Sequence, residues 1–149
     1  MATTREAALA ALLTALSSAA TFGVVTRRLL APEQMCSIGS PGLALVVHHE
    51  EYHRPNFAVP PKRTITASVL IYVNAGAANP NAVPDSLLNP IIDGIDTALK
   101  ADNGASNLCT LGGLVSHCSY SGSITITEGT LGDEAVALVP ISILVPATS

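Results

Sequence analysis

The segment from Leu43 to Val73 constrains the fold most, because two apolar runs flank a polar stretch that contains prolines. The first run, 43–47, follows a Pro-Gly turn and is short and fully apolar, which is typical of a buried strand. The second run has the period of two expected of a sheet strand: Ile65, Ala67, Val69 and Ile71 alternate with Thr64, Thr66, Ser68 and Leu70. The segment predicts two strands joined by a long arm, from Glu50 to Arg63.

The beginning of this arm matches a zinc-protease motif. Starting at His49 it reads His-Glu-Glu-Tyr-His, and H-E-x-x-H binds zinc when both histidines lie on one face of a helix. Here the preceding run predicts a strand, and Pro55 disfavours helical geometry at Arg54. In an extended chain the two histidines lie about 13 Å apart, too far to share one metal ion. We therefore expect no metal site, and a metal-dependent hydrolase built on His49, Glu50 and His53 is the least favoured alternative.

The other candidates for catalysis are weaker still. Asp93 and Asp96 are one helical turn apart, a spacing far more typical of a solvated helix face than of a buried acid–base pair. The serines around Gly122 read as a turn rather than a nucleophile elbow, and no glycine-rich phosphate-binding loop is present. We expect no catalytic residue and no cofactor, and hence a protein that is not an enzyme.

The composition indicates a chain that buries apolar surface against neighbours. Charged residues make up 12% of the 149 residues, about half the usual share of about 25%. Hydrophobic residues reach 48%, yet no window has the 18 apolar residues of a membrane helix, so no membrane partner is expected. An obligate oligomer and a merely alanine-rich composition both account for these values.

The charges and cysteines exclude further classes of protein. The net charge is −4 and the basic residues are scattered, which leaves no electrostatic footprint for direct nucleic-acid binding. Cys36, Cys109 and Cys118 form neither a metal-binding pattern nor an even disulfide framework. Reduced thiols in a cytoplasmic setting are the simplest interpretation.

Helices are predicted before and after the two strands. The first runs from Thr4 to Ser18, with Thr3 and Glu6 at capping-box spacing. The second runs from about 86 to 101, with Asn89 as a possible cap, so that Pro90 would begin its first turn. A short strand is expected at 24–25.

The last part of the chain predicts a hairpin. Its strands are 115–127, interrupted at Ser121-Gly122, and 135–145. Pro140 within the last strand indicates an edge position or a bulge. Together the elements predict one domain, 1–149, of the α+β class: an antiparallel-dominated (mixed) β-sheet with two helices packed on one face and a long β-hairpin arm.

The succession of these pieces resembles the phage tail terminator (tail completion) proteins of the lambda tail terminator type. The resemblance covers about residues 4–146 and rests on five pieces in order. They are the N-terminal helix with Val24-Val25-Thr26-Arg27-Arg28-Leu29, the strand Pro41-Gly42-Leu43-Ala44-Leu45-Val46-Val47, the arm ending in Lys62-Arg63-Thr64-Ile65-Thr66, the helix end Ile95-Asp96-Thr97-Ala98-Leu99-Lys100-Ala101-Asp102, and Leu111-Gly112-Gly113-Leu114-Val115 before the final hairpin.

This resemblance implies a structural virion protein that assembles as a homohexameric ring. Such a ring caps the tail tube, ends its polymerisation and presents a joining surface to a head-side connector or neck protein. DNA would pass through the lumen without specific binding, and the protein would reside in the virion tail or neck after assembly in the host cytoplasm. Another neck or connector protein of the virion and a non-viral homo-oligomeric binding module remain the alternatives.

The arm is the predicted partner interface, because aromatic residues and arginine are enriched at binding hot spots. The residues concerned are Tyr52, Arg54, Phe57, Lys62 and Arg63. The alternative is that Phe57 only packs the loop onto its own sheet.

Overall fold

The fold is α+β, with two helices and a six-stranded sheet in the described residues. The computed structural model describes residues 4–29, 34, 38–39, 41–54, 56–58, 61–74, 84–100, 109–127 and 134–145. The elements in chain order are α1 (Arg5–Ser17), β1 (Val24–Thr26), β2 (Gly42–His53), β3 (Lys62–Asn74), α3 (Pro84–Ala98), β4 (His117–Tyr120), β5 (Thr125–Thr127) and β6 (Glu134–Val145).

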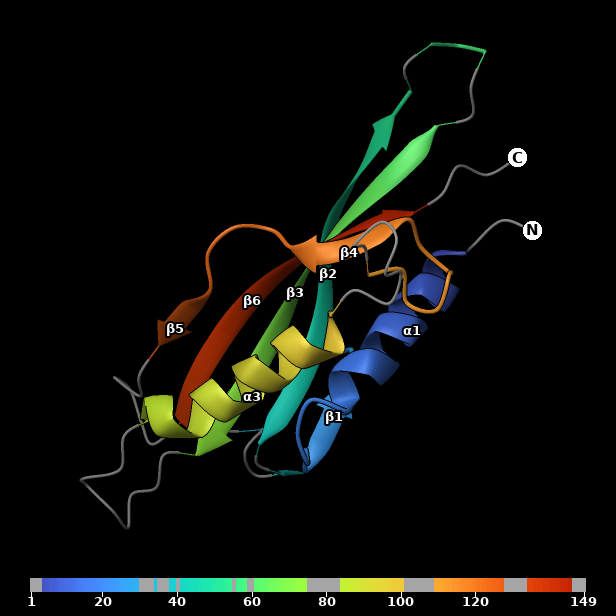
Figure 1. Cartoon of the computed structure of the whole chain (residues 1–149). Helices are drawn as coiled ribbons and strands as arrows, with labels where there is room; N and C mark the ends of the chain where they lie inside the picture. The colour runs from blue at the N-terminus through green and yellow to red at the C-terminus, as the bar shows by residue number, and fades with distance from the viewer. Residues whose placement is uncertain are drawn as a thin grey trace.

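The sheet is mixed but mostly antiparallel, as predicted. Its strand order is β1-β2-β3-β6-β4, and β5 also pairs with β6. Only β1 and β2 run parallel. Both helices lie on one face of this sheet, and the β2–β3 hairpin extends beyond the body of the protein (Figure 1). The described residues contain no helix long and apolar enough to cross a membrane.

The core lies between the helices and the sheet face that they cover. Helix α1 contributes Ala8, Leu9, Leu12 and Leu16, and α3 contributes Leu88, Ile91 and Ile95. Every second residue of β3 and β6 faces these helices, so the predicted set from Ile65 to Ile71 is fully buried. Because side chains alternate across a strand, the same period of two sends Thr64, Thr66 and Leu70 to the other face.

The N-terminal helix begins one residue later than the capping box predicts. Thr4 is the N-cap, and its Oγ1 accepts a hydrogen bond from the Ala7 N–H at 3.1 Å. The expected capping role of Thr3 with Glu6 is therefore wrong, because the Glu6 carboxylate forms a salt bridge with Arg27 instead. Thr3 itself lies outside the described residues.

Helix α3 begins earlier than predicted. It starts at Pro84, so Pro90 lies within the helix rather than in its first turn, and it ends at Ala98. An interior proline removes one backbone hydrogen bond, which is why the sequence favoured a start at Asn89. Leu88, fully buried in the turn before Pro90, provides the packing that holds this turn in helical form.

Pro140 lies in a central strand, so the predicted edge position is wrong. Strand β6 pairs with β3 on one side and with β4 and β5 on the other. The Ser121 N–H donates to the Pro140 carbonyl at 2.9 Å, so the backbone N and O of Pro140 point toward the β4–β5 chain. That chain leaves the ladder at 121–124, and the missing N–H of Pro140 therefore costs no ladder hydrogen bond. The break in regular pairing therefore lies in the segment between β4 and β5, not in β6 itself.

Candidate interaction surface

The arm predicted from the sequence, 50–63, is the distal part of the β2–β3 hairpin, and the two strands of this hairpin pair almost to its tip. The register runs from Gly42 opposite Tyr72 to His53 opposite Lys62. Strand β1 covers the outer edge of β2 only as far as Ala44, whereas β6 accompanies β3 to Arg63. The distal half of β2 therefore extends past the edge strand, as Figure 1 shows.

A β-bulge at His48 changes which side chains of the arm face the helices. Val47 pairs with Ala67 but His49 pairs with Thr66, so His48 is the extra residue. Its Nε2 lies 2.5 Å from the Ser68 hydroxyl on the face away from the helices. Before the bulge, odd-numbered residues of β2 face the helices; after it, even-numbered residues do, because side chains alternate along a strand. Glu50 and Tyr52 are consequently on the helix side.

Four of the five predicted interface residues are exposed. Phe57 is 95% exposed and Tyr52 60% exposed, and Arg54 and Lys62 also face solvent. Arg63 differs, because it is only 6% exposed and its Nε is buried. In the isolated chain Arg63 offers almost no surface to a partner.

Phe57 does not pack against its own sheet. Its phenyl ring is 95% exposed and therefore buries almost no apolar surface against the rest of the chain. The alternative that Phe57 only packs the loop onto its own sheet is wrong. No described acidic side chain lies within salt-bridge distance of Arg54 or Lys62. The distal arm thus exposes an aromatic ring and an arginine, two residue types enriched at interfaces, beside the cationic Lys62.

Arg5 connects the arm to α1, a contact that the sequence interpretation missed. Its Nε donates to both carboxylate oxygens of Glu50, at 2.6 and 2.9 Å, and its Nη2 donates to the Tyr52 hydroxyl at 2.6 Å. The hydrogen bond and charge of Glu50 raise the pKa of Arg5. A signal was available in the sequence: arginine in the first turn of a helix opposes the helix dipole and therefore needs an anionic partner.

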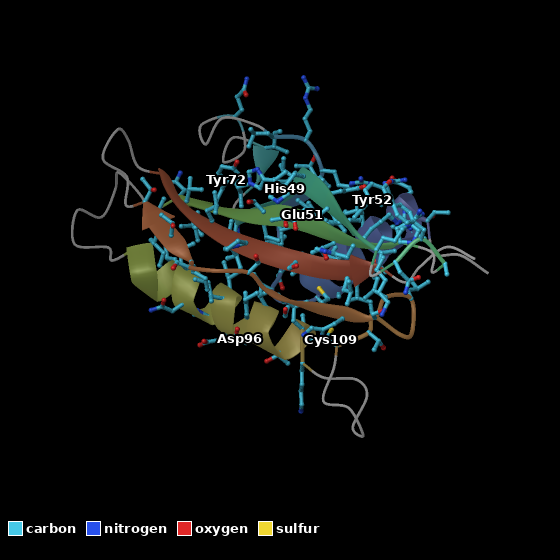
Figure 2. All side chains as sticks on the ribbon, turned by 90° about the horizontal axis from the view of Figure 1, so that it is seen from above. His49, Glu51, Tyr52, Tyr72, Asp96 and Cys109 are labelled. Atoms are coloured by element: carbon cyan, nitrogen blue, oxygen red, sulfur yellow. The ribbon has the colours of Figure 1, made fainter. Side chains whose placement is uncertain are left out.

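The zinc-protease motif lies in a strand, as predicted. His49, Glu51 and His53 all belong to β2, and the helical geometry that the motif requires is not present there. Figure 2 shows His49 and Glu51 on the side of the sheet opposite to Asp96. Over the part of the chain that the structure describes, no group of three or more His, Cys, Asp or Glu side chains is arranged to hold a metal ion.

The two aspartates of α3 are both exposed, as a solvated helix face requires. Asp96 accepts a hydrogen bond from the Tyr120 hydroxyl of β4. Partial burial and this bond raise the pKa of Tyr120. Asp96 therefore ties the outer side of α3 to the sheet.

Two of the cysteines are buried and reduced. Cys109 and Cys118 carry buried thiols, and burial raises the pKa of Cys118 to about 12. The Cys118 N–H donates to the Cys109 carbonyl at 2.9 Å. Cys36 lies outside the described residues.

Comparison with known proteins gives a structural match only. No family model and no curated protein sequence matches this chain. Among solved structures, the fold is similar to that of a chain in the virion of a native gene transfer agent (GTA) particle. The TM-score is 0.53 at 8% identity, and the match covers 91% of this chain and 92% of the other. The two proteins share a fold over nearly their full lengths.

Proposed function

We propose that this protein is a structural component of a virion and that it acts as a tail terminator. In this role it forms a homohexameric ring that caps the tail tube, ends tube polymerisation and joins the tail to a head-side connector. The role is structural rather than catalytic. It places the protein in the tail or neck of the virion, after assembly in the host cytoplasm.

The observation that supports the proposal most is the structural likeness to a virion component over 91% and 92% of the two chains. A likeness of this extent covers most of the fold rather than one common motif. The projecting arm adds to it, because the exposed ring of Phe57 and the exposed Arg54 are both available to a partner surface. The low charged fraction of 12% is consistent with flanks that neighbouring subunits cover.

The lumen of the proposed ring would carry DNA without binding it. The net charge of −4 favours this, since like charges lower the affinity for phosphates. A different neck or connector position would use the same fold and the same arm, and a non-viral oligomeric binding module would use the fold alone. Ring formation and tail joining separate these possibilities.

The first experiment is negative-stain microscopy of the purified protein, alone and mixed with tail tubes. We expect six-fold rings with a central hole wide enough for duplex DNA, and rings bound at one end of each tube. Rings that bind only to head-side connectors would favour another neck position. Monomers under all conditions would contradict the proposal.

The second experiment tests the arm with the double substitution R54A/F57A. Both residues are exposed, so the subunit should remain folded. A hot-spot residue contributes about 2 kcal/mol or more, so we expect tail joining to weaken by about thirtyfold or more. The matched control is R28A/L29A, which removes an exposed arginine and an exposed aliphatic side chain outside the arm. Normal tail completion with R54A/F57A would remove the arm from the proposed function.

A further inference from the structure

Arg5 occupies a position that its local environment alone disfavours. It is the first residue of α1, where the partial positive charge of the helix N-terminus repels a cation. The Glu50 carboxylate compensates this repulsion by accepting two hydrogen bonds from the Arg5 Nε. The contact joins residues 45 positions apart in the sequence, so it links two elements rather than stabilising the helix locally.

The bulge at His48 is what brings Glu50 and Tyr52 to Arg5. Without the extra residue, His49 and Glu51 would face α1, and Glu50 would lie on the opposite side of the hairpin. The Glu50 carboxylate and the Tyr52 hydroxyl, which accept the hydrogen bonds of Arg5, therefore both owe their position to the bulge. The contact between His48 and Ser68, a residue only 2% exposed, holds this irregularity against the sheet.

The first turn of α1 is attached to the sheet on a second side. Glu6 forms a salt bridge with Arg27, which directly follows β1. Leu9 and Leu12, one and two turns further along, are buried in the core. Burial of Leu9 and Leu12 thus holds the helix that carries Arg5 in place without involving the arm, whereas the Glu6–Arg27 salt bridge is solvent-exposed and contributes little.

We propose that Arg5 is a positioning residue that holds the β2–β3 arm at a fixed angle to the body of the protein. The consequence of this positioning rests on the proposed function. The arm meets its partner already oriented, with Arg54 and Phe57 free to make contact. Tyr52, whose hydroxyl is bound to Arg5, serves orientation. A binding element that is ordered beforehand loses less conformational entropy when its partner binds.

The test compares R5A and E50A with R27A, which breaks the other salt bridge of the same turn and serves as the matched control. We expect faster amide hydrogen exchange at Glu50–His53 and Lys62–Thr66 in R5A, and unchanged exchange there in R27A. The double variant R5A/E50A should exchange no faster than R5A, because both changes remove one contact. The charge swap R5E/E50R should restore protection. Unchanged exchange of the arm in R5A would overturn the inference.

Binding of rings to tail tubes separates this inference from the proposed function. In R5A the arm is no longer held in place and must become ordered when the ring binds the tube. Such ordering weakens the affinity of the ring for the tube by roughly three- to tenfold, and we expect this loss in R5A but not in R27A. Fast arm exchange in R5A with normal tube binding supports the positioning role and contradicts the role of the arm in joining. Equal exchange and equal loss of binding in R5A and R27A overturns the positioning role.

Discussion

The contact between Gly94 of α3 and the backbone after α1 gives the sharpest test of the packing. A Cβ atom added at Gly94 would lie 2.0 Å from the Ala19 carbonyl oxygen and 2.9 Å from its carbon. Ordinary contact begins at 3.4 Å, so the two segments would have to separate by about 1.4 Å. Both partners are backbone, and no side-chain rotation relieves the overlap. The substitution G94A must therefore displace α3 from α1.

The expected cost of G94A follows from two opposing effects. Alanine is about 1 kcal/mol more favourable than glycine within a helix. Overpacking a close contact costs about 3 kcal/mol when backbone must move, and Leu88, Ile91 and Ile95 would move with the helix. We expect a net loss of about 2 kcal/mol in the free energy of unfolding. For a chain of this size the melting temperature should fall by about 4–8 °C.

Urea and thermal unfolding of the purified protein measure this change. T97A is the matched control, because Thr97 is exposed on the same helix and donates one hydrogen bond to the Asp93 carbonyl. We expect T97A to remain within about 0.5 kcal/mol of the wild type. If G94A were as stable as the wild type, the close approach of α3 to Ala19 would be refuted.

Two further predictions concern the core. L12A should destabilise the protein by about 2–5 kcal/mol in urea unfolding, because Leu12 is fully buried between α1 and the sheet, whereas L13A at a partly buried position should cost clearly less. The pKa of Cys118 is raised from 9.0 to about 12, so the unfolded state ionises first and stability should fall as the pH rises from about 9 to about 12, by about 1.4 kcal/mol per unit. The slope of unfolding free energy against pH should be smaller in C118A over that window; an identical slope would contradict the burial of this thiol.

The regular part of the fold was predictable because simple periodicities determine it. The alternation along 64–73 predicts which side of β3 is buried, and the leucine spacing of α1 predicts which side of that helix packs on the sheet. The zinc-like motif could be discounted for the same reason, since the apolar run before His49 indicates a strand. Each of these inferences depends only on residues close together in the sequence.

The errors occurred where distant segments compensate a local penalty. Pro90 is tolerated within α3 while Leu88 is buried against the sheet, and Pro140 is tolerated in β6 because the facing chain leaves the ladder at 121–124. Neither compensation is visible from the residues next to the proline.

The arm shows the same limit. Its exposed residues were predictable, but the buried position of Arg63 and the contact of Arg5 with Glu50 depend on register. That register depends in turn on the bulge at His48, and no local pattern indicates a bulge there. Helix α3 ends at Ala98 rather than near 101 as predicted, and Leu99 and Lys100 already form a turn. The loop between the two strands of the predicted last hairpin, 128–133, lies outside the described residues.

The alternation of side chains beyond the bulge at His48 also limits how an arm of this kind can change in length. Adding one residue to each strand beyond the bulge would lengthen the arm by about 3.3 Å but turn the tip to the opposite side. Adding two to each strand would lengthen it by about 6.6 Å and keep the tip facing as before. Insertions that preserve contact with the same partner should therefore come in steps of two residues per strand. The length of the arm and the side to which its tip side chains point are therefore coupled, so the arm can lengthen or shorten toward the same partner only in steps of about 6.6 Å.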